Sequence, residues 1–291
     1  MLIVLNPTAG RRNRQLLAAT LAALETQGVK ADLRETQAPG HATELARAAA
    51  RAGQSPVIAA GGDGTVAEVV NGLMAEAASA PALGILPLGT ANVLAHELAI
   101  PTAPAALAEL LARRRRRAIW PGVLEQAGRR RWFVQMVGAG FDAEVVHRVD
   151  PRLKRRAGAA AYAWQGLVEA SRYAYPRIDL AIDGVPTTTH GVIVSKGRLY
   201  AGRYTLADEA SPLDRGYKVV LLDRPGALRT LAGGVALPFG RMARLPGVRI
   251  VAARQVEILG GSAPLQADGD PSGSGACSVR RPSRPLDVLM P

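Results

Sequence analysis

A short apolar run, a glycine turn and a helical pattern follow one another within residues 57–74, and this succession constrains the chain most. Residues 57–60 are small and apolar, as in a buried parallel strand, and the Gly-Gly-Asp-Gly at residues 61–64 interrupts any regular structure. From Thr65 onward, apolar residues recur at steps of three and four. The segment therefore predicts a strand, a tight turn and a helix.

The glycine turn has the properties of a phosphate-binding site. Glycines let backbone N–H groups approach an anion without interference from a Cβ atom, and the following helix directs its positive end to the same place. Asp63 inside the turn would repel a phosphate unless a cation accompanies it, and Mg-nucleotide supplies one. The structural alternative is a capping box, in which Thr65 and Glu68 only close the start of the helix.

Two further turns resemble the first in position. An apolar strand at residues 2–5 leads into Asn6-Pro7-Thr8-Ala9-Gly10 and the arginines Arg11, Arg12 and Arg14, which suit a second wall of a nucleotide site or a plain turn with solvated arginines. The strand at residues 83–88 leads into Gly89-Thr90-Ala91-Asn92. Because strands alternate with helices up to about residue 122, we expect an α/β domain with a mostly parallel sheet and a ligand at the carboxyl ends of its strands.

The pattern changes after Pro121-Gly122. Strands separated by short turns predict a mainly antiparallel, β-rich, sandwich-like domain over residues 123–279, with the apolar tail 280–291 returning to the first domain, residues 1–122. The clearest helix of the second domain covers residues 157–173. Four aromatic residues in or beside this helix suit either core packing or a wall that receives a lipid, and these are Tyr162, Trp164, Tyr173 and Tyr175.

Composition narrows the choice of compartment and partner. The net charge of +12 suits a polyanion, and the run Arg113 to Arg117 is either a binding patch or a solvated helix end. No nucleic-acid fold signature accompanies it, so we expect no nucleic acid. Cys277 is the only cysteine, which excludes an intrachain disulfide, and the histidines lack metal-ligand spacing. No apolar run is long enough to span a bilayer, so we expect a cytoplasmic protein in peripheral contact with an anionic membrane.

Five motifs occur in the order seen in the diacylglycerol kinase catalytic family, and the chain resembles a bacterial soluble lipid kinase of that family. The motifs are Asn6-Pro7 with Gly10, Gly61 to Thr65, Pro87 to Asn92, Gly138 to Asp142, and Asp268-Gly269-Asp270. The resemblance covers nearly the whole chain. It implies ATP-dependent transfer of the γ-phosphoryl group to a lipid hydroxyl, with Mg²⁺ as cofactor and a diacylglycerol-like lipid as first candidate, and hence a role in phospholipid biosynthesis.

The resemblance also implies the site residues. The general base of the family lies in an Asp-Gly-Glu turn, which reads Asp268-Gly269-Asp270 here, so the base falls on Asp270 with Asp268 beside it. The predicted nucleotide contacts are Asn6, Thr36, Gly61, Gly62, Asp63, Gly64, Thr65, Val66, Ala67 and Thr90.

Two other classes of function compete with this prediction. An NAD kinase shares the Gly-Gly-Asp-Gly turn and would phosphorylate a soluble dinucleotide, but Pro87 to Asn92 resembles the lipid family. A catalytically silent nucleotide or nucleic-acid binder would explain the charge, but not the presence of Asp63 and Asp270 together.

One loop departs from the family pattern. The family resemblance implies an aspartate that helps to hold a structural Mg²⁺, and in Leu213-Asp214-Arg215-Gly216-Tyr217 that position falls on Arg215. A guanidinium cannot ligate a cation. We therefore expect this structural metal site to be empty or weakened, with Arg215 supplying part of the charge by pairing with Asp214 or Asp208.

Overall fold

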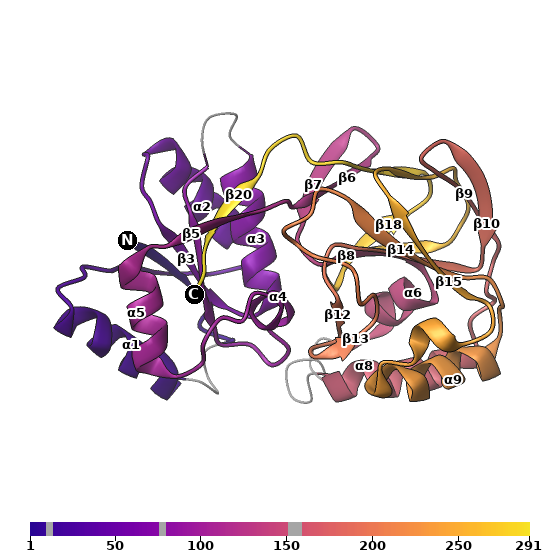
Figure 1. The fold of residues 1–291 in the computed structure, drawn as a ribbon, viewed down its shortest axis with the longest axis horizontal. Helices are drawn as coiled ribbons and strands as arrows, with labels where there is room; N and C mark the ends of the chain where they lie inside the picture. The colour runs from indigo at the N-terminus through magenta and orange to yellow at the C-terminus, as the bar shows by residue number, and fades with distance from the viewer. Residues whose placement is uncertain (10–13, 76–79, 151–158) are drawn as a thin grey trace. The chain divides into compact units, whose positions relative to one another are not determined.

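The computed structural model describes residues 1–9, 14–75, 80–150 and 159–291. The chain divides into two compact units (Figure 1). The first unit comprises Met1–Trp120 together with Arg284–Pro291, and the second comprises Pro121–Ser283. Each unit has its own sheets and core, and each is described by itself below.

A mostly parallel sheet forms the centre of the first unit. Its strands lie in the order β2-β1-β3-β4-β20-β5, and the first four are mutually parallel. The bounds are β1 (Leu2–Leu5), β2 (Asp32–Glu35), β3 (Val57–Gly61), β4 (Leu83–Pro87), β5 (Arg116–Ile119) and β20 (Leu286–Leu289). Strand β20 belongs to the C-terminal tail and pairs in parallel with β4, while β5 closes the edge antiparallel to β20.

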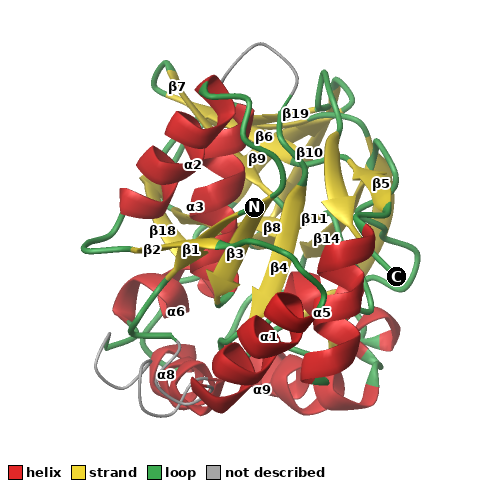
Figure 2. Cartoon of the chain, turned by 90° about the vertical axis from the view of Figure 1, so that its left-hand side faces the viewer, coloured by secondary structure: helices red, strands yellow, loops and turns green. Residues whose placement is uncertain are grey.

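Helices cover both faces of this sheet (Figure 2). Helices α2 and α3 pack together on one face, and α1 and α5 pack together on the other. The bounds are α1 (Arg14–Thr26), α2 (His41–Arg51), α3 (Asp63–Met74), α4 (Val93–Glu97) and α5 (Pro104–Arg113). From β1 the chain passes to β2 on one side, and then to β3 on the other side of β1. This reversal between β1 and β3 is where open α/β sheets bind ligands.

Two antiparallel sheets form the second unit, so the predicted fold class is confirmed for both halves of the chain. One sheet runs β10-β9-β16-β19-β6-β7 and the other β15-β14-β11-β8-β17-β18. The bounds of the first sheet's strands are β6 (Gly122–Gln126), β7 (Arg129–Phe133), β9 (Ile178–Ile182), β10 (Val185–Thr189), β16 (Val256–Ile258) and β19 (Cys277–Arg280). Those of the second are β8 (Met136–Gly140), β11 (Gly191–Ser195), β14 (Tyr217–Leu222), β15 (Val248–Ala253), β17 (Pro264–Ala267) and β18 (Asp270–Ser274).

The core of the second unit lies between these two sheets. Phe133 from the first sheet stacks on Tyr217 from the second, with ring centroids 5.9 Å apart. Gly122 makes room for this ring, since a Cβ atom there would lie 2.2 Å from Phe133. Cys277 is buried in the same core, and burial raises the pKa of its thiol to about 12. The free cysteine is therefore a packing residue.

Helices flank the sandwich more extensively than the sequence predicts. They are α6 (Phe141–Arg148), α8 (Ala159–Ala170), α9 (Ala227–Ala236) and the short 3-10 turns η2 (Leu237–Phe239) and η3 (Met242–Arg244), with a small ribbon of β12 (Leu199–Tyr200) and β13 (Tyr204–Thr205). Helix α6 packs against β17, and α8 contacts both α6 and α9. Among the described residues, no helix is both long and apolar enough to cross a bilayer.

Candidate functional site

In the first unit, the two predicted glycine turns are in backbone contact. A Cβ atom on Gly89 would lie 2.5 Å from the Cα atom of Gly62, so neither turn has space for a side chain at this point. The N–H of Leu88 donates to the carbonyl of Gly61 at 2.9 Å. Asn92 closes the second turn by accepting from the N–H of Gly89 at 3.0 Å. Two separate sequence motifs therefore form one glycine-lined surface.

Asn6 ties the end of β1 to this surface. Its Nδ2 donates to the hydroxyl of Thr65 at 3.2 Å, and its Oδ1 accepts from the backbone and hydroxyl of Thr8 at 3.0 and 2.7 Å. Thr65 in turn fills the space above Gly61, where a Cβ atom would lie 2.3 Å from the threonine hydroxyl. The predicted residues Gly10, Arg11 and Arg12 lie outside the described residues.

The predicted nucleotide residues gather at one edge of the sheet. Asn6, Thr36, Gly61 and Thr90 each end or follow one of the parallel strands β1, β2, β3 and β4. Thr36 is half-buried and its N–H donates to the carbonyl of Leu5 at 2.8 Å, while Thr90 is exposed. Since carboxyl ends of parallel strands share an edge, this is the position expected for a nucleotide.

Asp63 joins the first glycine turn to the start of α4. Its Oδ1 accepts from the backbone N–H of Val93 at 2.6 Å, at the start of α4. Burial raises the pKa of the carboxyl, and the N–H groups of Val93 and Leu94 oppose that shift. The carboxylate therefore binds the second glycine turn to the first, and its presence is explained without a metal ion.

The structural alternative, a capping box of Thr65 and Glu68, is not formed. Helix α3 follows Gly62 without a side-chain cap, and Glu68 accepts from the N–H of Ala42 at the start of α2 at 3.2 Å. Val66 and Ala67 are each only 3% exposed, so their side chains pack in the core. The turn thus offers a ligand the backbone of α3, whose first N–H groups have no partner within a helix.

In the second unit, Asp268 organises the turn that carries the predicted base. Its backbone is left-handed, with φ of 50°. Its carboxylate accepts from the N–H groups of Val134, Gln135 and Met136 at 2.8, 2.8 and 3.0 Å. Burial raises the pKa of Asp268 to about 6, and these N–H groups oppose the shift. Asp268 is thus held within the fold, where it anchors β17 to the start of β8.

Asp270 is the accessible carboxylate of this turn. Its side chain is 42% exposed and forms an ion pair with Arg131, with Nη2 and Oδ2 3.3 Å apart. Arg131 also donates to the carbonyl of Ala267 and to the hydroxyl of Ser272, both at 3.0 Å. The guanidinium therefore positions the Asp270 carboxylate, which stays partly exposed.

A hydrogen-bond network beside this turn was not predicted. Asp142 at the start of α6 accepts from the hydroxyl of Tyr200 and, at 2.7 Å, from Nε2 of Gln266. Gln266 in turn accepts from the N–H of Gly269 at 2.9 Å. A Cβ atom on Gly138 would lie 2.2 Å from Asp142, so this glycine makes the space for the carboxylate. The motif Gly138 to Asp142 was singled out from the sequence, but it gave no sign of these partners.

The four aromatic residues predicted as a possible lipid wall lie at three positions. Tyr173 and Tyr175 pack with Phe141 in a cluster whose ring centroids are 5.1 to 5.9 Å apart. Tyr162 donates from its hydroxyl to the carbonyl of Gly269 at 3.5 Å. Trp164 is 60% exposed. Core packing thus explains two of the four predicted aromatic residues, and Tyr162 reaches the Asp268 to Asp270 turn.

The loop that departs from the family pattern contains a built-in cation, the buried Lys196. Lys196 is 1% exposed, and its ammonium group donates to the carbonyls of Asp214 and, at 3.0 Å, of Gly216. It also lies 5.2 Å from the centre of the Tyr217 ring. Burial lowers the pKa of Lys196 to about 8, and the charge of Asp214 opposes this shift. Because an ammonium group holds these carbonyls, the loop does not fit a divalent cation.

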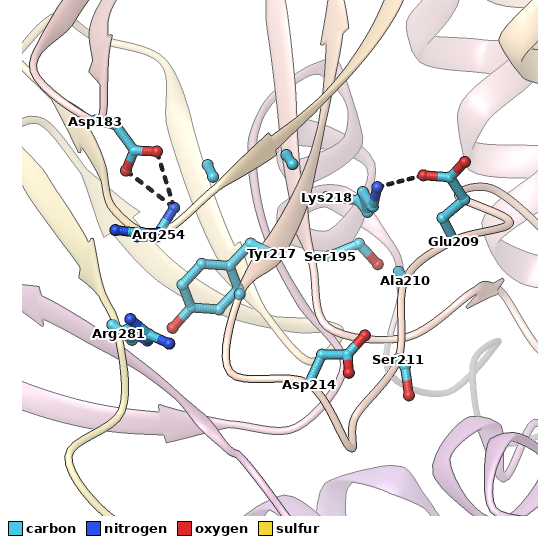
Figure 3. A pocket seen from close by; sticks show the side chains of 13 residues that line it. Asp183, Ser195, Glu209, Ala210, Ser211, Asp214, Tyr217, Lys218, Arg254 and Arg281 are labelled. Atoms are coloured by element: carbon cyan, nitrogen blue, oxygen red, sulfur yellow. Dashed lines mark hydrogen bonds and ion pairs between the residues drawn. The ribbon is translucent and has the colours of Figure 1, made fainter.

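A pocket of about 330 Å³ lies beside this loop (Figure 3). Charged side chains line much of it: Lys218 pairs with Glu209, and Asp183 accepts from the backbone N–H of Arg254. Asp214 and Ser211 approach it from the same loop. Such a lining is unlike the apolar wall that a lipid requires. Among the described residues, no group of three or more His, Cys, Asp or Glu side chains is placed to hold a metal ion.

Both units of the chain match known protein families. Residues 1–123 match the family described as Diacylglycerol kinase catalytic domain, and residues 135–290 match YegS C-terminal NAD kinase beta sandwich-like domain. Over 250 residues the chain is 36% identical to a Pseudomonas putida protein named "Probable lipid kinase YegS-like", covering 84% of this chain and 82% of that protein. Over 184 residues it is 33% identical to the Bacillus subtilis "Diacylglycerol kinase", covering 62% and 59%.

A solved structure shares the fold. The crystal structure of a diacylglycerol kinase from Bacillus anthracis is 18% identical, with a TM-score of 0.71, and covers 100% of this chain and 96% of that one.

Proposed function

We propose, since the chain belongs to the bacterial diacylglycerol kinase family, that it transfers the γ-phosphoryl group of ATP to the hydroxyl of a diacylglycerol-like lipid. The observation that carries this proposal is the glycine-lined surface at the carboxyl ends of β1 to β4, where Gly62 and Gly89 touch. It lies in the half of the chain that matches a kinase catalytic domain. The acceptor-side carboxylate lies in the other half, at Asp270.

The glycine surface is suited to the phosphates of ATP. Its backbone is bare on the side where the two turns meet, and the N–H groups of the first turn of α3 are directed toward the same edge. Mg²⁺ would arrive with the nucleotide and neutralise charge on the phosphates. Asn6 and Thr65 fix the neighbouring strand end, so the surface is held in position before a ligand binds. In phosphoryl transfer, such positioning contributes much of the catalysis.

Asp270 is suited to accept the proton of the lipid hydroxyl. As the hydroxyl oxygen bonds to the γ-phosphorus and the bond to ADP breaks, its proton passes to the carboxylate. Arg131 holds the carboxylate, and Asp268 shapes the turn through three backbone N–H groups. Arg131 and Asp268 therefore act as positioning residues, whereas Asp270 would touch the acceptor.

The second candidate is phosphorylation of a soluble dinucleotide. One observation favours it, because the family matched by residues 135–290 is described as NAD kinase beta sandwich-like. The relatives named above are lipid and diacylglycerol kinases, which favours the lipid proposal.

An assay with labelled ATP separates the two candidates. The purified protein is incubated with ATP labelled at the γ-phosphate and Mg²⁺, with a panel of lipids in mixed micelles and, separately, with NAD. We expect label in a lipid phosphomonoester. Label that appears only in NADP would refute the lipid proposal.

A further inference from the structure

Helix α9 directs its large apolar side chains toward solvent. Leu228 is 83% exposed and Val235 68%, and Leu231 lies on the same side at 39%. The inward side of the helix carries Thr230, whose hydroxyl donates to that of Tyr175 at 2.8 Å, and the buried Gly233. Residues at steps of three and four share a helix face. Here the solvent face is the more apolar one, the reverse of the usual arrangement.

Neighbouring elements extend this exposed surface. Phe239 in η2 follows α9 and is 72% exposed, and α8, which contacts α9, exposes Trp164 at 60% and Leu167 at 54%. Both views show α8 and α9 beside each other on the second unit (Figures 1 and 2). We call the apolar face the set Trp164, Leu167, Leu228, Leu231, Val235 and Phe239. Exposed apolar side chains concentrated on neighbouring elements are typical of an interaction site.

The segment that carries α9 and η2 has charge of one sign. Residues 224–254 include six arginines and no aspartate or glutamate. Arg229, Arg241 and Arg244 are exposed, and within the described part of the chain the structure shows no ion pair to any of them. The partner of this face should therefore be both apolar and anionic.

We propose that the apolar face docks on an anionic lipid surface, with its side chains entering the interface and Arg229, Arg241 and Arg244 contacting lipid headgroups. A helix that lies in a membrane interface has this combination of residues. A second copy of the chain fits less well, because two such faces would bring their arginines together. Nucleic acid would bind the arginines but would have no use for Leu228 or Phe239.

This docking surface is linked to the proposed acceptor site. Tyr162 on α8 donates to the carbonyl of Gly269, beside Asp270, while Trp164 and Leu167 on the same helix belong to the apolar face. The inference rests on the proposed function in this respect: a lipid hydroxyl would reach Asp270 from the surface on which α8 lies. The attachment site is thus distinct from the Arg113 to Arg117 run predicted from the sequence.

Vesicle flotation tests the proposal with matched variants. Wild-type protein is mixed with vesicles of phosphatidylcholine alone or with phosphatidylglycerol added. The apolar test variant is L228Q/V235Q/F239Q, and its control is V185Q/L259Q, which changes two apolar residues exposed at 64% and 58% elsewhere in the second unit. The charge test variant is R229Q/R241Q/R244Q, and its control is R113Q/R115Q/R117Q.

We expect both test variants to bind anionic vesicles at least tenfold more weakly than wild type, and both controls to bind like wild type. The tryptophan fluorescence of the wild type, to which the exposed Trp164 contributes, should shift to shorter wavelength with anionic vesicles. Test variants that bind like wild type, or a loss confined to R113Q/R115Q/R117Q, would overturn the proposal. So would wild-type dimers in light scattering that the apolar variant dissociates.

The test also distinguishes failure of this inference from failure of the proposed function. With a short-chain, water-soluble diacylglycerol as acceptor, we expect the apolar variant to keep wild-type turnover, because no membrane is needed. If the wild type floats with anionic vesicles but phosphorylates no lipid, the docking surface stands and the proposed function is wrong. If the wild type phosphorylates the soluble lipid but does not float with vesicles, the proposed function stands and the docking surface is wrong.

Discussion

Alanine at Gly89 should force apart the two glycine turns of the first unit. Its Cβ atom would lie 2.5 Å from the Cα atom of Gly62 and 2.8 Å from Oδ1 of Asn92. Ordinary carbon contacts are about 3.5–4.0 Å, so a shift of roughly 1 Å is needed. Such overpacking costs about 1–3 kcal/mol, and weakening the Asn92 hydrogen bond costs about 0.5–1.5 kcal/mol more. We expect a loss of about 2–4 kcal/mol in the free energy of unfolding.

Gly64 provides the matched control, because it belongs to the same motif but has no atom within 4 Å of the place that a Cβ atom would take. It lies in the first turn of α3, where alanine in place of glycine stabilises a helix by about 0.5–1 kcal/mol. Gly64→Ala should therefore leave the fold intact. If phosphates approach the backbone here, however, the added methyl group should raise the KM for ATP.

Thermal unfolding and ATP-dependent turnover, measured on both variants, test these expectations. We expect Gly89→Ala to lower the unfolding temperature and to weaken ATP binding. We expect Gly64→Ala to raise the KM for ATP by about tenfold or more without lowering the unfolding temperature, a change of about 1.4 kcal/mol in binding. A Gly89→Ala protein as stable as wild type would refute the contact between the turns. An unchanged KM in Gly64→Ala would refute phosphate binding at α3.

Three further predictions concern buried charges. Because Lys196 holds the loop carbonyls, chelation of Mg²⁺ should leave the unfolding temperature of the nucleotide-free wild type unchanged, whereas Lys196→Met should lower it. Stabilisation of the wild type by Mg²⁺ would count against the built-in cation. The pKa of Asp268 is raised to about 6 in the folded chain, so this carboxyl stabilises the fold below about pH 4, and that stabilisation of about 3 kcal/mol is lost as pH rises through 6. Urea unfolding of Asp268→Asn across this pH range should lack the decline, and a profile identical to that of the wild type would contradict the prediction. Asp63→Ala leaves the N–H of Val93 without its acceptor and should lower the free energy of unfolding by about 1–3 kcal/mol. Asp63→Asn, which keeps Oδ1, should lower it by less, and equal losses in the two variants would argue against the hydrogen bond.

The fold was predictable where local pattern and tertiary structure agree. The strand, turn and helix of residues 57–74 were predicted because β3 is buried throughout and α3 has a strong apolar face. Helix α9 was not predicted, because its two glycines and outward-facing leucines do not give the pattern of a helix that packs on a core. Edge strands such as β18 were missed as well, since Asp270-Pro271-Ser272-Gly273-Ser274 has the composition of a turn.

The site was predictable as a set of segments but not as a set of contacts. Spacing along the chain placed Gly61 and Gly89 at strand ends, but it did not bring the two turns into contact. The partners of Asp63 and Lys196 come from backbone groups 30 and 18 residues away, which no side-chain motif encodes. The sequence therefore did not reveal that the carboxylate of Asp63 accepts from the N–H of Val93. The loop sequence also gave no sign that Lys196, which follows β11, donates to the carbonyls of Asp214 and Gly216.

The most direct test of the proposed chemistry is turnover by Asp270→Asn alongside ATP binding by the same protein. Asparagine keeps the size of the side chain but cannot take the proton of an acceptor hydroxyl, whereas the glycine surface of the first unit is unaltered. We expect lipid phosphorylation to fall by at least about a hundredfold while the Kd for Mg-ATP stays within about twofold of wild type. Full activity in Asp270→Asn would contradict the assignment of Asp270 as the proton acceptor.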